Sequence, residues 1–220
     1  TLMRIIYIKL GTSIQENSVS RKIQGQINGL IDHNVDCKGY FFSTKVSSKQ
    51  PFSKNIELVP VQKSTRKYFS QLQQKSYFIN ALEEILENED FDYAYLRFTY
   101  SHPKLLSIAR KYSNKLIIEF NTKHSDEIKI NSLKTKYTSF FSGLLSKIQD
   151  VYIPILSIHF LLKTIIDRAK LVVGVTSEIT KYYETNKTKG LTVSNGIDVK
   201  NYSVRSAPSI IDSKVKMLVL

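Results

Sequence analysis

Short apolar runs alternate along the chain with segments whose apolar residues recur every three or four positions, and this alternation restricts the fold more than any other feature. Residues 4–10 are rich in β-branched and aromatic residues and predict a buried strand. Residues 18–31 have a helical period, with Ser18 as the expected N-cap, and residues 35–42 predict a second strand. A strand, a helix and a strand within about 40 residues form a βαβ unit, which implies a parallel sheet.

The same alternation continues along the rest of the chain. The further strands that we predict cover residues 56–61, 93–98, 115–120, 171–175, 191–193 and 215–220. The further helices that we predict lie within residues 68–88, from Pro103 onward, in two segments of residues 131–169, and from a cap at Thr176 or Ser177 to Tyr183. The predicted fold class is therefore α/β: a doubly wound, mainly parallel, Rossmann-like sheet with helices on both faces.

A change in composition near the end of the chain predicts a domain boundary. Residues 206–213 have the composition of a linker, and the strand predicted after them has no partner elements behind it. We expect one Rossmann-like domain over residues 1–205. Residues 206–220 would then be a linker and the first strand of a second domain.

The chain is strongly basic. Its 220 residues include 32 Lys and Arg against 19 Asp and Glu, which gives a net charge of +13 at pH 7. Such an excess favours anionic partners: nucleic acid, anionic lipid or phosphorylated small molecules. The 13 tyrosines and 11 phenylalanines would suit stacking on nucleic-acid bases. They equally suit a composition biased toward Lys, Asn and Ile, with the aromatic residues in the core.

The cysteine content and the apolar runs indicate a cellular location. Cys37 is the one cysteine, so neither an intrachain disulfide nor a multi-cysteine metal site can form, which suits a reducing cytoplasm. The first residues have no signal-peptide pattern. The nearest approach to a membrane-spanning run, residues 152–166, is short and is interrupted by His159 and Lys163. We therefore expect a cytoplasmic protein.

The familiar nucleotide-binding and metal-binding motifs are missing from the sequence. Gly11 stands alone after the first strand, without a G-x-G-x-x-G motif, which argues against NAD or FAD binding. The sequence has neither a G-x-x-x-x-G-K-[ST] loop nor a G-x-S-x-G motif. Its four histidines have no zinc-ligand spacing. We expect no cofactor and no metal.

Polar residues follow the predicted strands at their carboxyl ends, where open parallel sheets bind ligands. The richest group, residues 121–127, places His124 beside Asp126 and Glu127. Because a histidine titrates near neutral pH, His124 could orient or deprotonate a substrate hydroxyl. A solvated loop with incidental polar residues is the competing interpretation.

Two more residues near strand ends have alternative explanations. Arg97 could hold a phosphate, or it could form a structural ion pair with Asp92. His102 directly precedes Pro103, which favours a role at a helix start.

The most specific pattern lies in residues 171–202. A strand, a Ser-capped helix and a short strand lead to residues 195–198, Asn-Gly-Ile-Asp, and an aromatic residue, Tyr202, follows. This order resembles the retaining glycosyltransferases of the GT-B fold, family-4 type. In that family the Asn-Gly turn ends the amino-terminal domain, and the chain then crosses to the donor domain.

A second stretch, residues 92–127, is similar to the capsule and surface-polysaccharide members of that family. Those members have a strand with Arg, a helix, a strand ending in Glu, and then a Thr and an acidic pair. They often carry Glu-x-Pro-Thr, whereas this chain has Glu119, Phe120, Asn121 and Thr122 in those places. Asn121 replaces the proline, so the match is partial.

The resemblance implies the N-terminal, acceptor-side half of a GT-B fold. It implies an enzyme that moves a sugar from a nucleotide-sugar to a glycan or lipid-linked acceptor, with retention, in surface-polysaccharide biosynthesis. The donor would bind mainly through a second domain, so we expect residues 1–220 alone to be inactive. The site residues that we predict are His124, Asp126 and Glu127 for catalysis; Gly11, Thr12, Asn17, Arg97, Asn121 and Thr122 for acceptor binding; and Thr176, Ser177, Asn195, Gly196 and Asp198 for the donor side of the domain boundary.

Membrane contact and two other functions stay open at this point. The positive charge suits the inner face of a bacterial membrane, and residues 131–169 mix lysines with apolar residues as an interfacial helix does, although core helices explain that pattern too. The main alternative is a non-enzymatic, basic Rossmann-like module that binds nucleic acid or a protein partner. Nucleic acid is disfavoured because the basic residues are dispersed and no recognition motif is present. Another GT-B enzyme, such as an epimerase, is the third interpretation.

Overall fold

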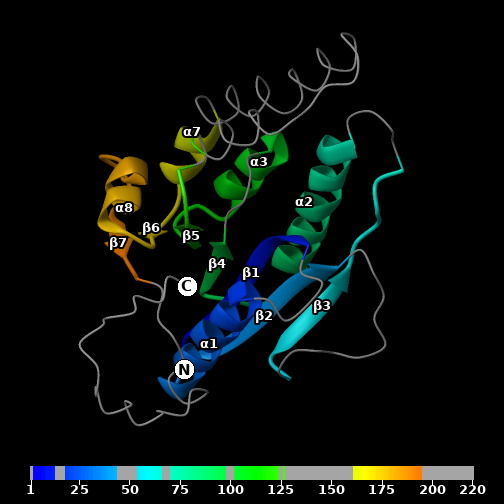
Figure 1. Ribbon diagram of the computed structural model, residues 1–220, viewed down its shortest axis with the longest axis horizontal. Helices are drawn as coiled ribbons and strands as arrows, with labels where there is room; N and C mark the ends of the chain where they lie inside the picture. The colour runs from blue at the N-terminus through cyan, green and yellow to red at the C-terminus, as the bar shows by residue number, and fades with distance from the viewer. Residues whose placement is uncertain are drawn as a thin grey trace, which may run out of the picture.

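The chain folds around a seven-stranded sheet in which every pair of neighbouring strands is parallel (Figure 1). The computed structural model describes residues 2–12, 18–43, 54–65, 70–97, 102–123, 126 and 161–194. In the order β3-β2-β1-β4-β5-β6-β7, the strands are β3 (Ile56–Pro60), β2 (Asp36–Ser43), β1 (Arg4–Thr12), β4 (Tyr93–Arg97), β5 (Leu116–Phe120), β6 (Leu171–Gly174) and β7 (Gly190–Thr192). The predicted parallel, Rossmann-like fold class is confirmed.

The described helices are also where the sequence predicts them. They are α1 (Ser18–Asp32), α2 (Ser70–Asn88), α3 (Pro103–Lys111), α7 (Lys163–Ile166) and α8 (Ser177–Tyr183). The predicted linker, the strand over residues 215–220 and most of the helical region 131–169 lie outside the described residues. Within the described part of the chain, no helix has the length and apolar character that crossing a membrane requires.

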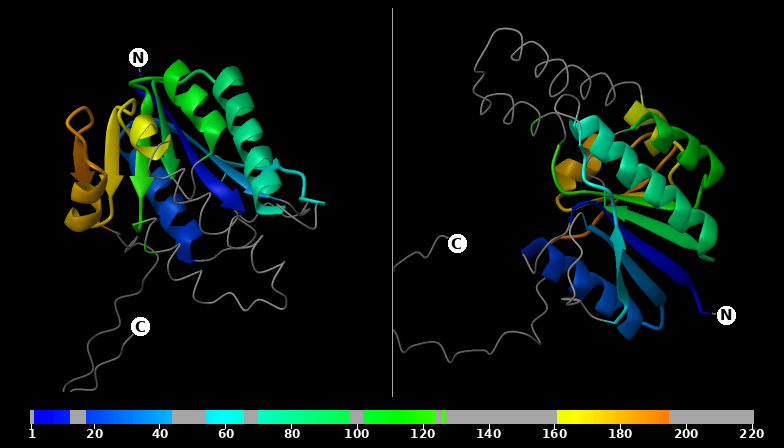
Figure 2. Two further views of the ribbon diagram at one scale, coloured as in Figure 1. Left: turned by 90° about the horizontal axis from the view of Figure 1, so that it is seen from above. Right: turned by 90° about the vertical axis from the view of Figure 1, so that its right-hand side faces the viewer.

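Helices cover both faces of the sheet (Figure 2). On one face α1 packs its apolar side, with Ile23 and Ile27, against Tyr7 of β1 and Phe41 of β2. On the other face α2, α3, α7 and α8 enclose a larger apolar core. This second core gathers side chains from strands and from all four of these helices, among them Leu82, Leu96, Ile108, Ile118, Ile165 and Tyr183. The core is therefore continuous from the α2 edge to the α8 edge of the sheet.

Two glycines allow a helix to sit close to a strand. A Cβ atom on Gly39 of β2 would lie 2.6 Å from the Cδ1 atom of Ile27 on α1. A Cβ atom on Gly174 of β6 would lie 2.5 Å from the backbone nitrogen of Thr180 on α8 and 2.8 Å from its Cα atom. Because a backbone cannot yield as a side chain can, Gly174 is the stricter requirement.

The chain reverses its direction of strand addition at β1. From β1 it runs through α1 to β2 and on to β3, and it then returns through α2 to β4 on the other side of β1. The helices α1 and α2 leave the sheet on opposite faces. The carboxyl ends of β1 and β4 are therefore the topological switch point, which is where open α/β sheets bind their ligands.

Candidate functional site

A row of charged residues crosses the sheet at this switch point. Lys9 of β1 is the register partner of Arg97 of β4, and Arg97 is the register partner of Glu119 of β5. Register partners on parallel strands point to the same face of the sheet. The three residues are buried, with exposed fractions of 8%, 7% and 1%. Charged residues are rarely buried so fully in a strand, so we take this row as the candidate functional site.

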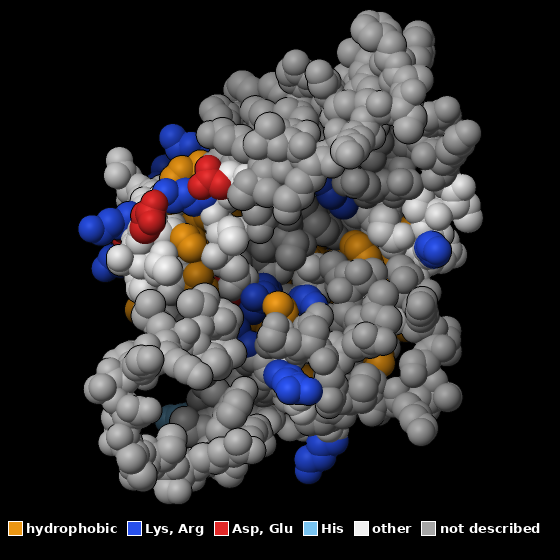
Figure 3. All heavy atoms as spheres, viewed as in Figure 1, with side chains coloured by type: hydrophobic (Ala, Val, Ile, Leu, Met, Phe, Trp, Pro, Cys, Tyr) orange, Lys and Arg blue, Asp and Glu red, His pale blue; other side chains and the backbone are white. Residues whose placement is uncertain are grey.

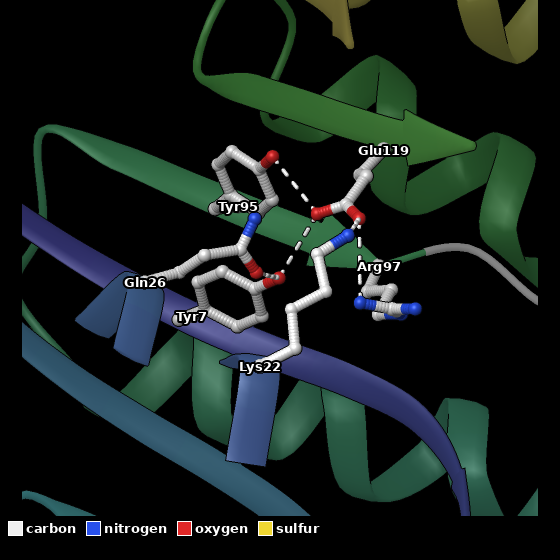
Figure 4. Close-up of polar contacts among 6 residues, drawn as sticks. All are labelled: Tyr7, Lys22, Gln26, Tyr95, Arg97 and Glu119. Atoms are coloured by element: carbon white, nitrogen blue, oxygen red, sulfur yellow. Dashed lines mark hydrogen bonds and ion pairs between the residues drawn. The ribbon is translucent and has the colours of Figure 1, made fainter. Parts of the chain in front are cut away.

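Glu119 is the centre of the site (Figure 4). Its Oε2 atom accepts hydrogen bonds from the hydroxyls of Tyr7, at 3.0 Å, and Tyr95, at 2.9 Å. Its Oε1 atom lies 3.3 Å from the Nζ atom of Lys22 and 3.3 Å from an Nη atom of Arg97. Both carboxylate oxygens are thus satisfied within the protein, which is what a buried carboxylate requires.

Helix α1 contributes two of the polar side chains. Lys22 and Gln26 are four residues apart, so they share one face of the helix and both reach the site (Figure 4). The Tyr7 hydroxyl lies 2.9 Å from the side-chain amide of Gln26. The Tyr7 hydroxyl has one proton to donate. When it donates that proton to Glu119, Gln26 complements it best with the NH2 group of its side-chain amide oriented toward the Tyr7 oxygen. The Tyr7 and Tyr95 rings stack with centroids 4.6 Å apart.

Burial and the closeness of like charges disfavour the charged forms of the lysines in this site. Burial, with the Arg97 guanidinium nearby, lowers the pKa of Lys9 to about 8. Burial also lowers the pKa of Lys22, although the Glu119 carboxylate acts in the opposite direction. Desolvation raises the pKa of the Tyr7 hydroxyl well above its usual value, so that hydroxyl stays protonated and can donate. An additional anion would relieve the unfavourable burial of the cations.

The residues that follow β1 lie next to this site in sequence. The backbone of Gly11 and Thr12 extends β1, and its register with β2 shifts between Lys9 and Thr12, where Thr12 pairs with Phe42. The strand is therefore irregular directly after Lys9. Asn17, the third acceptor-binding residue predicted here, lies outside the described residues.

Asn121 and Thr122 lie just beyond β5. The Oδ1 atom of Asn121 is buried, without a hydrogen-bond partner in the described part of the chain. The Thr122 carbonyl accepts a hydrogen bond of 3.2 Å from the hydroxyl of Tyr183 on α8. Arg97 is thus the acceptor-binding prediction whose side chain contacts the charged row.

The predicted catalytic group is described only at Asp126. That residue is exposed, and its backbone N–H donates to the Lys123 carbonyl at 3.0 Å. Lys123 in turn pairs with Glu178 of α8. His124 and Glu127 lie outside the described residues, so the catalytic assignment of the three stays a prediction.

The predicted donor-side residues begin at α8. Thr176 is the N-cap of that helix, with its Oγ1 atom accepting from the backbone nitrogen of Ile179 at 3.3 Å, and Ser177 is the first helical residue. This capping role accounts for the Thr176 side chain without a ligand. The other three residues of this group, Asn195, Gly196 and Asp198, lie outside the described residues.

Two sequence interpretations of strand-end residues have clear outcomes. The ion pair between Asp92 and Arg97 is wrong: Asp92 accepts from the backbone nitrogen of Arg4 at 2.8 Å, and Arg97 pairs with Glu119. The reason is geometric, because Asp92 precedes β4 and Arg97 ends it, on opposite edges of the sheet. The helix-start role of His102 is confirmed, since its Nδ1 atom accepts from the backbone nitrogen of Lys104 at 3.2 Å.

Sequence reasoning did not assign Lys9, Lys22 or Glu119 to the site. Lys9 and Glu119 are single charged residues inside otherwise apolar strand runs, which is a usable signal for a buried functional residue. Lys22 gives no such signal, because a lysine on an amphipathic helix is ordinary. Among the described residues, no group of three His, Cys, Asp or Glu side chains could hold a metal ion.

Comparison with known proteins gives a likeness among solved structures. No protein-family model matches the chain, and no curated protein sequence matches it. Among solved structures, the chain is similar to Phytolacca americana UGT2, determined as a complex with UDP-2fluoro-glucose and pterostilbene, with 6% sequence identity and a TM-score of 0.48. The match covers 87% of this chain and 52% of that structure, so the chain spans about half the length of the protein it resembles.

Proposed function

We propose that this chain is the N-terminal, acceptor-side domain of a GT-B glycosyltransferase. The enzyme would move a sugar from a nucleotide-sugar to a glycan or lipid-linked acceptor in surface-polysaccharide biosynthesis, with retention at the anomeric carbon. The observation that supports this most is the contact between Arg97 and Glu119 at the switch point. These two residues are the Arg and the Glu of the strand–helix–strand pattern that resembles the surface-polysaccharide enzymes.

The chemistry of sugar transfer fits a positively charged strand edge. The reaction develops negative charge on the departing diphosphate and requires a proton to leave the acceptor hydroxyl. In this proposal the second domain holds most of the donor diphosphate. Lys9, Lys22 and Arg97 attract negative charge of the acceptor at the edge of the sheet, and Glu119 orients the two cations it contacts. Residues 124–127, which follow β5, supply the proton acceptor.

An assay of the full-length enzyme tests the proposal. The release of nucleoside diphosphate would be measured with a panel of nucleotide-sugars, in the presence of extracted lipid-linked glycans. We expect release with one donor class, and Arg97→Lys to lower kcat/KM at least about tenfold, because a lysine loses the fork of the guanidinium. The matched control is Arg110→Lys on the exposed side of α3, which should change kcat/KM less than about twofold.

Three outcomes would refute the proposal or parts of it. A folded full-length protein that releases no nucleoside diphosphate with any donor refutes the glycosyltransferase function. Equal effects of the two arginine substitutions refute the placement of the site. Transfer by residues 1–220 alone refutes the assignment of the donor site to a second domain. Proton NMR of the product gives the anomeric configuration and so tests retention.

We also propose that the enzyme works in the cytoplasm, at the inner face of the membrane. The net charge of +13 supports this, since anionic lipid attracts basic surfaces. Sedimentation with liposomes of anionic and of neutral lipid would measure the association. Binding to anionic liposomes that falls with salt is the expected result, and equal binding to both liposomes, or none, rules it out.

A further inference from the structure

Three cations from three different elements converge at the switch point. Lys9 comes from β1, Arg97 from β4 and Lys22 from α1, and the side chains of Arg97 and Lys22 are 8% and 12% exposed. Lys9 and Arg97 are direct register partners, so two like charges stand side by side on neighbouring strands. On the face shown in Figure 3, lysine and arginine side chains gather near the middle of the molecule, where Figure 1 places β1.

The guanidinium of Arg97 has a hydrogen-bond donor that the described residues do not use. Its Nη1 atom is fully buried and makes no hydrogen bond within the described part of the chain, and its nearest recorded acceptor is the Oε1 atom of Glu119 at 3.3 Å. That oxygen also faces Lys22 at the same distance. A guanidinium presents five N–H donors in a fixed fork that matches two oxygens of a phosphate. A buried donor without a hydrogen bond is therefore a specific indication of an absent acceptor.

We propose that Lys9, Lys22 and Arg97 form a binding site for a phosphate group of the acceptor substrate. This inference rests on the proposed function and narrows its acceptor to a phosphorylated one. A phosphate dianion fits better than a carboxylate, because the site already contains the Glu119 carboxylate and still has two lysines and a guanidinium around it. The approach is along the carboxyl edge of β1 and β4, where such sheets bind ligands.

Direct measurement of phosphate binding to the full-length enzyme tests the site without any turnover. Inorganic phosphate and a hexose 1-phosphate are titrated by calorimetry, with chloride at the same ionic strength as the reference. We expect both to bind, and Lys22→Met and Arg97→Lys each to weaken binding about tenfold or more, as expected for loss of a hydrogen bond to a charged group. The matched control is Lys181→Met on the exposed side of α8, which also removes one positive charge and should leave the affinity within about twofold.

Glu119→Gln separates a ligand site from a purely structural cluster. Removing the one negative charge that both cations contact leaves them more in need of an anion, so the variant should bind phosphate several-fold more tightly. A purely structural cluster would show no gain in affinity; a loss of stability is expected for this variant in either case and does not distinguish the two. Because this variant gains a property, poor folding of the charge-removing variants does not decide the test.

The results also distinguish an acceptor phosphate from a donor phosphate, and failure of this inference from failure of the proposed function. Saturating UDP should leave the phosphate affinity unchanged; displacement by UDP would assign the site to the donor and overturn the inference. Absence of phosphate binding, or equal weakening by Lys181→Met, overturns it as well. Sugar transfer by the full-length enzyme without phosphate binding would leave the proposed function standing and remove this inference alone.

Discussion

Replacing Glu119 by Gln should destabilise the protein far more than the same replacement at Glu89. Both carboxylates accept from a tyrosine and a lysine: Glu89 contacts Tyr40 and Lys38. They differ in burial, since the Glu119 side chain is 1% exposed and that of Glu89 is 33% exposed. They differ also in the number of partners, because Glu119 contacts a second tyrosine and an arginine, so the comparison tests burial and partner number together.

The magnitude follows from the contacts of the two Glu119 oxygens. A glutamine has one oxygen and one amide group, so it can serve the two phenols or the two cations, but not both pairs. Two hydrogen bonds to a charged group, at about 1.5–3 kcal/mol each, or an uncompensated buried charge are lost. We expect a loss of about 3–5 kcal/mol, out of a total stability of roughly 5–15 kcal/mol for a domain. Glu89→Gln should cost about 1 kcal/mol or less.

Urea denaturation followed by circular dichroism would measure both variants. The midpoint concentration should fall markedly for Glu119→Gln and slightly for Glu89→Gln, with unchanged slopes. Phosphate should restore part of the stability of Glu119→Gln if the cations bind it. A cost below about 1 kcal/mol at Glu119, or equal costs at the two sites, would refute the view that this carboxylate holds a buried cluster together.

Three further predictions concern the core and its ionisable groups. Gly174→Ala should destabilise the fold by about 1–3 kcal/mol, because the new methyl group meets the backbone of Thr180. Gly29→Ala should stabilise α1 by about 0.5–1 kcal/mol, because a Cβ atom there has nothing within 4 Å. Urea denaturation measures both changes. The pKa of Lys9 is about 8 in the folded protein, below its unfolded value of 10.5. Between these two values the unfolded state binds more protons, so the stability of the folded state rises with pH. Relative to Lys9→Met, the wild type should therefore gain stability between pH 8 and 10. Burial raises the pKa of Cys37 to about 12, so its reaction with a thiol reagent at pH 7 should be slow and should accelerate in urea along the unfolding curve; rapid reaction in the native state would contradict its burial.

The sequence was sufficient for the elements of the fold but not for their order. Short apolar runs and helical periods located every described strand and helix, because burial of a strand on both faces or of a helix on one face imposes those patterns directly. The order β3-β2-β1-β4 depends on α1 and α2 packing on opposite faces, which is a tertiary choice. No local pattern encodes it, so the switch point could be expected for this fold class but not assigned to a pair of strands.

The candidate site could be predicted only in part, for a related reason. Arg97 was found because an arginine ends an otherwise apolar strand. Glu119 was seen in the family pattern but was not given a role, since its partners were unknown. Lys22 stands 97 positions from Glu119 in sequence, and only the packing of α1 brings the two together. The residues between 124 and 127 were chosen by type, and of these the structure describes Asp126 alone.

The close packing of α1 on β2 affects the position of a charged side chain at the candidate site. Gly39 lets Ile27 approach the sheet, and Lys22 extends from the same helix to reach Glu119. A side chain at position 39 would meet the Cδ1 atom of Ile27, 2.6 Å away, and would oblige that side chain to shift on the helix that also carries Lys22. Tolerance of a larger residue in the middle of β2 would therefore depend on how far Ile27 can yield without disturbing the helix that places the Lys22 ammonium group in the proposed site.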